Sequence, residues 1–233
     1  MSHKFLEPIK IGNQTVKNRV MFLAMAKNIS NFDDSVSAKD IAYVESVAAG
    51  GVGLLVPGAM IVDPEWPSVL PLQPGIYDDR FIPGLRRLVL AAHKYDAKIL
   101  FQLWHPGATN YSGIDPKTVD ELTKDEIHAI QDKFVAAAKR AMAAGADGIV
   151  TGVLTPAGAL DTDALHPIYA AARQAAEKTH RTVDCTLHRA FDVCCDPFAA
   201  LEAAKQLGLA TILTSGQAAS APQGAALLRQ LVE

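Results

Sequence analysis

Polar and sulfur-bearing side chains gather directly after an apolar run near the C-terminal end of the sequence. The run "TVDCTL" is followed by His188, Arg189 and Asp192, and then by Cys194 and Cys195. Imidazole, guanidinium and carboxylate groups that share one strand end are candidates for acid–base catalysis. The short spacing between Arg189 and Asp192 favours an orienting ion pair over an acid–base pair.

His188 and Cys194 also have the side-chain types that bind a soft metal ion. Cu(I) favours thiolate and imidazole ligands, so these two residues are the candidate copper ligands. Cys194 and Cys195 are adjacent, however, and adjacent cysteines lack the spacing of a chelating motif. The spacing therefore favours a structural role for the cysteines over a metal site.

Two further features could bind or activate a small molecule. The stretch "TSGQ" at residues 214–217 could offer backbone amides to a phosphate, and a tight strand–helix turn at Gly216 is an equal alternative. Lys27 follows an earlier apolar run and could act as a catalytic amine. A single lysine at a strand end does not by itself distinguish catalysis from packing.

The elements that must position these residues alternate along the chain. A hairpin around Gly12 and Asn13 comes first, and six apolar runs then alternate with helical patterns; the runs cover residues 20–26, 52–62, 97–107, 147–154, 182–192 and 209–217. This alternation predicts an α/β fold with a parallel sheet, namely a TIM-type (βα) barrel of six units, where a complete barrel has eight. An open, doubly wound sheet is the alternative, although no G-x-G-x-x-G motif follows the first run.

The clearest helix signal lies at residues 122–145. Thr123 and Glu126 have the spacing of a capping box, and Gly145 is a typical end. Asp196 followed by a proline predicts another helix start, and Pro167 predicts a kink or an interruption within residues 161–180.

Composition limits the classes of function. The 233 residues are 49% hydrophobic and 20% charged, with a formal net charge of −3, which gives no electrostatic reason to expect nucleic acid or an anionic membrane surface. No apolar run approaches the roughly 20 residues that span a bilayer, and three cysteines do not suggest a disulfide framework. We therefore expect a cytoplasmic protein with a small-molecule ligand at most.

Four motifs in the first two thirds of the chain occur in the order of a known enzyme family. They are "LEPIKIGNQTVKNRV", "GGVGLLVPGAMIVDP", "GIYDDRFIPGLRRLVLAAHKYDAKILFQLWHPG" and "ELTKDEIHAIQDKFVAAAKRAMAAGADGI". On these motifs, residues 5–149 resemble the old yellow enzyme family, the FMN-dependent ene and enoate reductases. The resemblance implies that Met25, Ala26, Ala59 and Gln102 line FMN, with the Gln102 amide facing the pyrimidine edge, and that Arg189 could supply a cation near the flavin N1–C2 edge. For Gln102 alone, a polar position in the barrel interior is the alternative.

The sequence also departs from that family. Ala24 replaces the proline of the first strand, and Ala108 stands where an arginine often follows "HPG". The pair of side chains that polarises the substrate carbonyl falls on Gly152 and Thr155, and each missing donor is worth about 3 kcal/mol of transition-state stabilisation. The family's phosphate-binding loops after strands seven and eight have no counterpart in six units.

The last third of the chain has motifs of a different family. "GIVTGVLTPAGALD", "VDCTLHRAFDVCCDP" and "ATILTSGQ" make residues 148–233 resemble the CutC copper-homeostasis family, which is also a (βα) barrel. The resemblance implies a polar pocket around His188, Arg189, Asp192 and Cys194, with copper as a candidate ligand.

Together these features predict one barrel-like domain, residues 1–233, with two parts. Residues 1–147 form the old yellow enzyme-like half, with the hairpin and units one to three, and residues 148–233 form the CutC-like part, with units four to six. We expect an FMN-binding oxidoreductase lineage that is catalytically impaired or inactive; an active form would be an NAD(P)H-dependent enoate or ene reductase. The alternatives are a CutC-like copper-binding protein and an engineered or fragmentary scaffold with no activity. The missing units predict open strand edges, which favour self-association.

Overall fold

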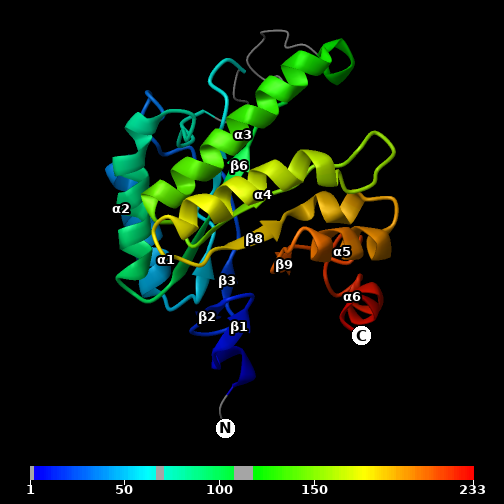
Figure 1. The fold of residues 1–233 in the computed structure, drawn as a ribbon. Helices are drawn as coiled ribbons and strands as arrows, with labels where there is room; N and C mark the ends of the chain where they lie inside the picture. The colour runs from blue at the N-terminus through cyan, green and yellow to red at the C-terminus, as the bar shows by residue number, and fades with distance from the viewer. Residues whose placement is uncertain (1–2, 67–70, 108–117) are drawn as a thin grey trace.

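The computed structural model describes residues 3–66, 71–107 and 118–233, in which helices cover the outer face of one curled sheet and a hairpin lies at its amino-terminal end (Figure 1). The strands are β1 (Ile9–Ile11), β2 (Gln14–Val16), β3 (Met21–Phe22), β4 (Leu54–Leu55), β5 (Ala59–Ile61), β6 (Lys98–Trp104), β7 (Gly148–Thr151), β8 (Asp184–Leu187) and β9 (Thr211–Ile212). The α-helices are α1 (Ala38–Ala49), α2 (Ile82–His93), α3 (Lys124–Ala144), α4 (Thr162–Glu177), α5 (Pro197–Gln206) and α6 (Ala225–Val232). Short 3-10 helices are η1 (Lys4–Leu6), η2 (Asp79–Phe81), η3 (Val119–Glu121) and η4 (Arg189–Val193).

The main sheet is parallel and follows the order of the sequence. Its strands lie in the order β3-β4-β6-β7-β8-β9, and β5 also pairs with β6. The predicted second strand is divided into β4 and β5 at Pro57 and Gly58, so the sheet has six strand positions. A sequential order without a reversal is that of a barrel and not of a doubly wound sheet. The predicted six-unit (βα) barrel with an N-terminal hairpin is confirmed.

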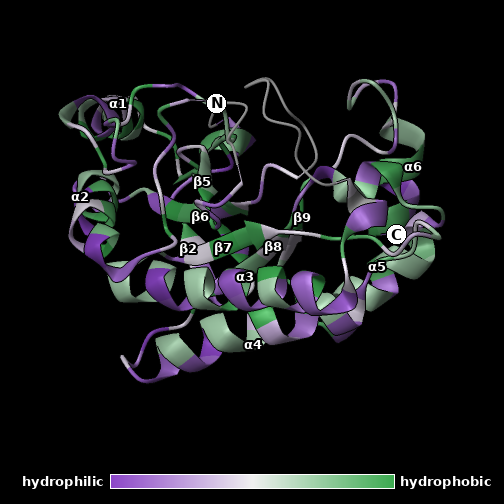
Figure 2. Cartoon of the chain, turned by 90° about the horizontal axis from the view of Figure 1, so that it is seen from above, coloured by the Kyte–Doolittle hydropathy of each residue, from purple (hydrophilic) through white to green (hydrophobic). Residues whose placement is uncertain are grey.

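The barrel is partial, because its two edge strands do not meet. Within the described ranges, β3 and β9 each pair with a strand on one side only. In Figure 2, α1 and α2 lie at one end of the sheet, α5 and α6 lie at the opposite end, and α3 and α4 run along the side between them. No helix in the described part of the chain is long and apolar enough to cross a membrane.

Local sequence signals account for the helix boundaries. Thr123 and Glu126 form the predicted capping box at the start of α3, which ends at Gly145 with φ of 100°. The Asp196 carboxylate accepts hydrogen bonds from two backbone amides at the start of α5. The predicted interruption at Pro167 does not occur, since α4 continues from Thr162 to Glu177. Pro167 stands in the second turn, where its ring removes a single intrahelical hydrogen bond.

Apolar side chains pack on both faces of the sheet, and the larger of the two clusters lies between the sheet and the helices. Residues on its convex face, among them Leu55, Ile99, Phe101 and Ile149, are at most 1% exposed and pack against the helices. This burial is the main source of stability, at about 25 cal/mol per Å² of apolar surface.

A second, smaller apolar cluster fills the concave side of the sheet near its base. It comprises Val16, Leu54, Val56, Leu100 and Val150. Because Val16 belongs to the hairpin, β1 and β2 close the amino-terminal end of the barrel. The carboxyl ends of the strands lie at the opposite end of the sheet.

Asp147 connects the hairpin, the third strand position and the fifth at this closed end. Its carboxylate accepts hydrogen bonds from His93 Nε2 at 2.7 Å and Lys98 Nζ at 3.1 Å. Its backbone oxygen accepts from Gln14 Nε2 at 2.6 Å and from the Asp184 amide at 3.1 Å. Burial alone would raise the pKa of Asp147, but these donors outweigh it and lower the pKa. The carboxylate therefore stays ionised and joins segments that are far apart in the sequence.

Candidate functional site

Four predicted flavin-contact residues lie at the carboxyl ends of the first three strand positions. Ala59 on β5 is the register partner of Gln102 on β6, and Gln102 is in turn the partner of Val150 on β7. Met25 and Ala26 follow β3 and are exposed. The structure thus brings Ala59 and Gln102 side by side on neighbouring strands, and their role towards a flavin stays a prediction.

The Gln102 amide is available to a ligand. The residue is half-buried, and its side-chain amide makes no hydrogen bond to any other residue that the structure describes. A primary amide can donate and accept at once, which suits the alternating polar atoms of a flavin pyrimidine edge. Its neighbour Ala59 has only a methyl side chain and offers no hydrogen-bond partner to the amide.

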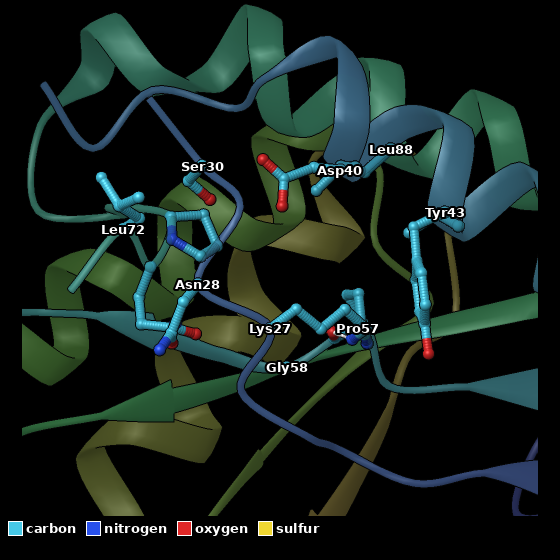
Figure 3. A pocket seen from close by; sticks show the side chains of 12 residues that line it. Lys27, Asn28, Ser30, Asp40, Tyr43, Pro57, Gly58, Leu72 and Leu88 are labelled. Atoms are coloured by element: carbon cyan, nitrogen blue, oxygen red, sulfur yellow. Dashed lines mark hydrogen bonds between the residues drawn. The ribbon is translucent and has the colours of Figure 1, made fainter. Parts of the chain in front are cut away.

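Lys27 lies between the ends of the first two strand positions, beside Pro57 and Gly58 (Figure 3). Its ammonium donates to the backbone oxygens of Met25, at 3.1 Å, and of Pro57. The nitrogen also lies 4.4 Å from the centre of the Tyr43 ring, within the range of a cation–π contact. Burial lowers the pKa of Lys27, and the nearby carboxylate of Asp40 partly offsets this effect.

A small cavity of about 20 Å³ adjoins Lys27. Ser30 and Asp40 are among its lining residues, and Figure 3 shows them together with Lys27. The Ser30 hydroxyl is buried and has no hydrogen-bond partner among the described atoms. The cavity is of the size that holds one water molecule, so it is too small for a substrate.

The polar residues after β8 and β9 bind mainly to each other. Arg189 donates to Asp192 and to the Ser215 hydroxyl, both at 2.7 Å. Asp192 also accepts from the Thr214 hydroxyl at 2.6 Å and from the amides of Ser215 and Gln217 at 3.0 and 3.1 Å. The side chain of Asp192 is only 8% exposed. The expected ion pair between Arg189 and Asp192 is therefore present, as part of a larger network.

This network sets the charge of Asp192. Burial alone would raise its pKa, but hydrogen bonds from Thr214, Arg189, Gln217 and Ser215 outweigh burial and lower the pKa from 3.8 to about 2. The amides of the "TSGQ" stretch that could have bound a phosphate are thus directed at an ionised carboxylate. Of the two interpretations of that stretch, the tight turn describes this arrangement, and Gly216 supplies its positive φ of 71°.

His188 and Cys194 are each bound to a neighbouring group. The amide of Ala190 donates to His188 Nδ1 at 3.1 Å, which caps η4. Gln217 Nε2 donates to the Cys194 sulfur at 3.3 Å. Burial lowers the pKa of His188 and raises that of Cys194. No group of three or more His, Cys, Asp or Glu side chains in the described ranges could hold a metal ion, so the copper site stays a prediction without structural support.

The two positions where the old yellow enzyme family has side chains that polarise the substrate carbonyl are Gly152 and Thr155, after β7. A Cβ atom on Gly152 would lie 2.6 Å from Leu187 Cδ1 and 2.8 Å from His188 Nδ1, so His188 fills the space of a side chain at position 152. Thr155 belongs to a turn in which its hydroxyl accepts from the Ala159 amide at 3.2 Å. Ala108 lies outside the described residues.

A charged cluster at the ends of β5 and β6 was not predicted. Asp63 is fully buried, and Lys133 Nζ on α3 donates to it at 2.8 Å. His105 Nε2 lies 3.5 Å from the same carboxylate, while its Nδ1 accepts from the Gly107 amide. The sequence feature that could have predicted this cluster is Asp63 itself, an acidic residue directly after an apolar strand. The cluster fixes the end of the second strand position against α3.

Comparison with known proteins gives two partly overlapping family matches. Residues 4–153 match the NADH:flavin oxidoreductase / NADH oxidase family, and residues 108–233 match the CutC family. The chain is 37% identical to an NADH oxidase of Thermoanaerobacter brockii, over 60% of this chain and 24% of that protein. It is 43% identical to a CutC family protein of Vibrio vulnificus, over 52% of this chain and 45% of that protein. The chain thus spans less than half the length of each of these two relatives.

Solved structures support the fold. An old yellow enzyme homologue from Zymomonas mobilis superimposes with a TM-score of 0.72 at 20% identity, over 91% of this chain and 73% of that chain. A 2-naphthoyl-CoA reductase superimposes with a TM-score of 0.73 at 20% identity, over 91% of this chain and 40% of that one. Each family model covers more than half of the sequence. The chain therefore belongs to two families at once, the NADH:flavin oxidoreductase / NADH oxidase family through residues 4–153 and the CutC family through residues 108–233.

Proposed function

We propose that this protein binds FMN at the carboxyl ends of β3, β5 and β6. The observation that carries the proposal is the half-buried Gln102 amide, which has no partner among the described residues and lies beside Ala59 on the neighbouring strand. Membership of the flavin oxidoreductase family over residues 4–153 supports it. When bound, FMN would supply hydride chemistry, and the protein would supply the surface that orients its ring.

The described residues suit the flavin ring better than its phosphate. The amides of Ser215 and Gln217 are directed at Asp192, and the Arg189 guanidinium is bound to Asp192 and Ser215. We therefore expect the phosphate to add little to the affinity.

Titration of the purified protein with FMN and with riboflavin, followed by the visible flavin absorbance, tests both statements. We expect a shifted flavin band with either ligand, at Kd values within about threefold of each other. Protein that leaves the spectrum unchanged at millimolar FMN would refute the proposal. FMN that binds more than tenfold tighter than riboflavin would show that a phosphate site exists.

We also propose that ene-reductase activity is impaired. Gly152 has no side chain, so it supplies no donor to a developing enolate, and the Thr155 hydroxyl lies in a turn where it accepts from the Ala159 amide. Anaerobic oxidation of NADPH with FMN and 2-cyclohexenone is the test. The expected rate equals that of free FMN, and saturable turnover above that rate would contradict impairment.

Copper binding by the CutC-like part is the alternative, supported by the family match over residues 108–233. It would use His188 and Cys194. Cu(I) that stays bound through dialysis and is released by Cys194→Ser would favour this alternative, whereas a copper content equal in both proteins would exclude these ligands.

For partners, we propose association with a second copy through the open sheet edges. Val20, Met21, Leu23 and Met25 line one edge and are 38 to 54% exposed, and no proline or charge interrupts residues 20–26, although such residues commonly protect edge strands. Light scattering tests the proposal: Leu23→Lys should reduce the association, and Leu90→Lys on α2, where the leucine is also exposed, should not. A monomeric wild type would contradict it.

We propose a cytoplasmic location from cysteine usage. All three cysteines are free, and Cys195 is exposed, which suits a reducing compartment. Cell fractionation tests this location.

A further inference from the structure

The ends of the first two strand positions leave backbone oxygens without a partner in the sheet. The second position is divided between β4 and β5 at Pro57 and Gly58, and β3 ends at Phe22, before Met25. The oxygens of Met25 and Pro57 therefore lie outside the strand ladder. Backbone oxygens outside a ladder accept from side chains or from water.

Lys27 supplies that donor to both oxygens. Its ammonium donates to the backbone oxygen of Met25, two residues before it, and to that of Pro57, which is 30 residues away on the neighbouring strand position. Three N–H groups on one nitrogen make such a double contact possible. Hydrogen bonds from a charged donor are stronger than neutral ones.

The surroundings keep the ammonium in this position. The Tyr43 ring lies 4.4 Å from the nitrogen and the Phe22 ring lies 5.8 Å from it, so aromatic faces replace part of its water shell. Asp40 on α1 adds a favourable charge. A half-buried cation with two aromatic rings and a carboxylate nearby has few alternative positions.

The backbone at Gly58 is adapted to this close approach. Its φ is 147°, and a Cβ atom there would lie 3.0 Å from the Met25 oxygen and 3.9 Å from the Lys27 nitrogen. A glycine therefore lets the two strand ends approach each other, and Lys27 joins them.

The joined segments carry three of the predicted flavin contacts, Met25 and Ala26 on one side and Ala59 on the other. We infer that Lys27 is a positioning residue, which holds the segment after β3 and the segment before β5 in the relative placement that FMN would contact. This inference rests on the proposed FMN site. It assigns Lys27 a role through its neighbours, in place of the catalytic amine that the sequence left open.

Two measurements on Lys27→Met, Lys27→Arg and Lys94→Met test the inference. Lys94 is the control, because its amine pairs with Glu45 at 2.5 Å on the surface and is 62% exposed. In the flavin-free protein, hydrogen exchange should become about tenfold faster in residues 21–28 and 56–61 of Lys27→Met. Exchange in both segments should stay unchanged in Lys94→Met.

In FMN titrations, the Kd of Lys27→Met should rise about tenfold, which corresponds to about 1.4 kcal/mol. Lys27→Arg retains the charge and several donors, so it should recover part of the affinity and the shifted flavin band. Lys94→Met should bind as the wild type does.

The outcomes separate this inference from the proposed function. Unchanged exchange in Lys27→Met overturns the inference, whether or not FMN binds. Faster exchange with an unchanged Kd and flavin spectrum also overturns it, because Lys27 would then be structural only. A wild type that ignores FMN refutes the proposed function, and with it the positioning role, even if exchange shows that Lys27 joins the two segments.

Discussion

The Gln102 amide on β6 is left without a partner in the described structure, whereas the polar side chains at the ends of β8 and β9 bind to one another. The Gln102 side chain has no hydrogen-bond partner among the described residues, while the Asp192 carboxylate accepts from Arg189, Thr214 and Ser215. Both regions are rich in polar residues at equivalent places in the barrel. The difference shows that such residues indicate a binding site only when their hydrogen bonds are not already made within the protein.

Removal of the Asp192 carboxylate should have the largest effect on stability. Asp192→Ala leaves the amides of Ser215 and Gln217 without an acceptor, and hydrogen bonds to charged groups are worth about 1.5–3 kcal/mol each. We expect the free energy of unfolding to fall by about 3 kcal/mol in urea titrations. Glu202→Ala removes an exposed carboxylate that pairs with Lys205 and should cost less than about 0.5 kcal/mol. If both substitutions lowered the free energy of unfolding equally, the Asp192 network would contribute no more stability than an exposed ion pair.

Protonation of Asp192 at low pH should remove the stability that its ionised carboxylate provides. The folded-state pKa of Asp192 is about 2, against an ordinary value of 3.8, so its ionisation stabilises the fold above pH 3.8. That contribution, about 2 kcal/mol by linkage, is lost as the pH falls through about 2. The gap in unfolding free energy between wild type and Asp192→Asn should therefore narrow from pH 5 to pH 2. A gap that stays constant over this range would argue against an ionised Asp192.

Restoring a histidine at position 152 should damage the fold and not create activity. A side chain there would contact Leu187 and His188, and overpacking of this kind costs about 1–3 kcal/mol. We expect Gly152→His to unfold about 2 kcal/mol more easily by urea titration. Val153→His is the control, because Val153 is 38% exposed and should tolerate the change. If both variants were equally stable, the close contact with His188 would not be limiting.

The smallest expected effect is on ligand affinity alone. Gln102→Leu removes an amide without partners in the described structure, so the stability should change little. The Kd for FMN should rise about tenfold in an absorbance titration, while Gln174→Leu, on the exposed face of α4, should leave it unchanged. If the Gln102 substitution lowered stability but not affinity, the barrel-interior alternative for this residue would be preferred.

Local patterns predicted the elements well. Thr123 with Glu126, Gly145 and Asp196 place the helix ends by hydrogen bonds between residues a few positions apart, and such pairs are visible in a sequence. The division of the second strand at Pro57 and Gly58 was not predicted, because the run of apolar residues continues through it.

Long-range partner choice was less predictable. The Gln14 amide bonds to Asp147, 133 residues away, and Lys27 bonds to Pro57, 30 residues away. The sequence showed that "TSGQ" could present backbone amides to a ligand. It could not show that the amides of Ser215 and Gln217 donate to Asp192 instead. Which polar groups stay free for a ligand depends on how closely the strand ends approach, and that is settled only by the packing of the whole barrel.

The contacts of Asp147 show how the segments of two protein families can be joined in one fold. The two family matches overlap over residues 108–153, and Asp147 lies within that overlap. Its contacts reach Gln14, His93 and Lys98 on one side and Asp184 on the other. If the two parts came from different proteins, Asp147 would already be held by Gln14, His93 and Lys98 of the first part. Its backbone oxygen could then accept from Asp184 of the second part without any new residue at the join.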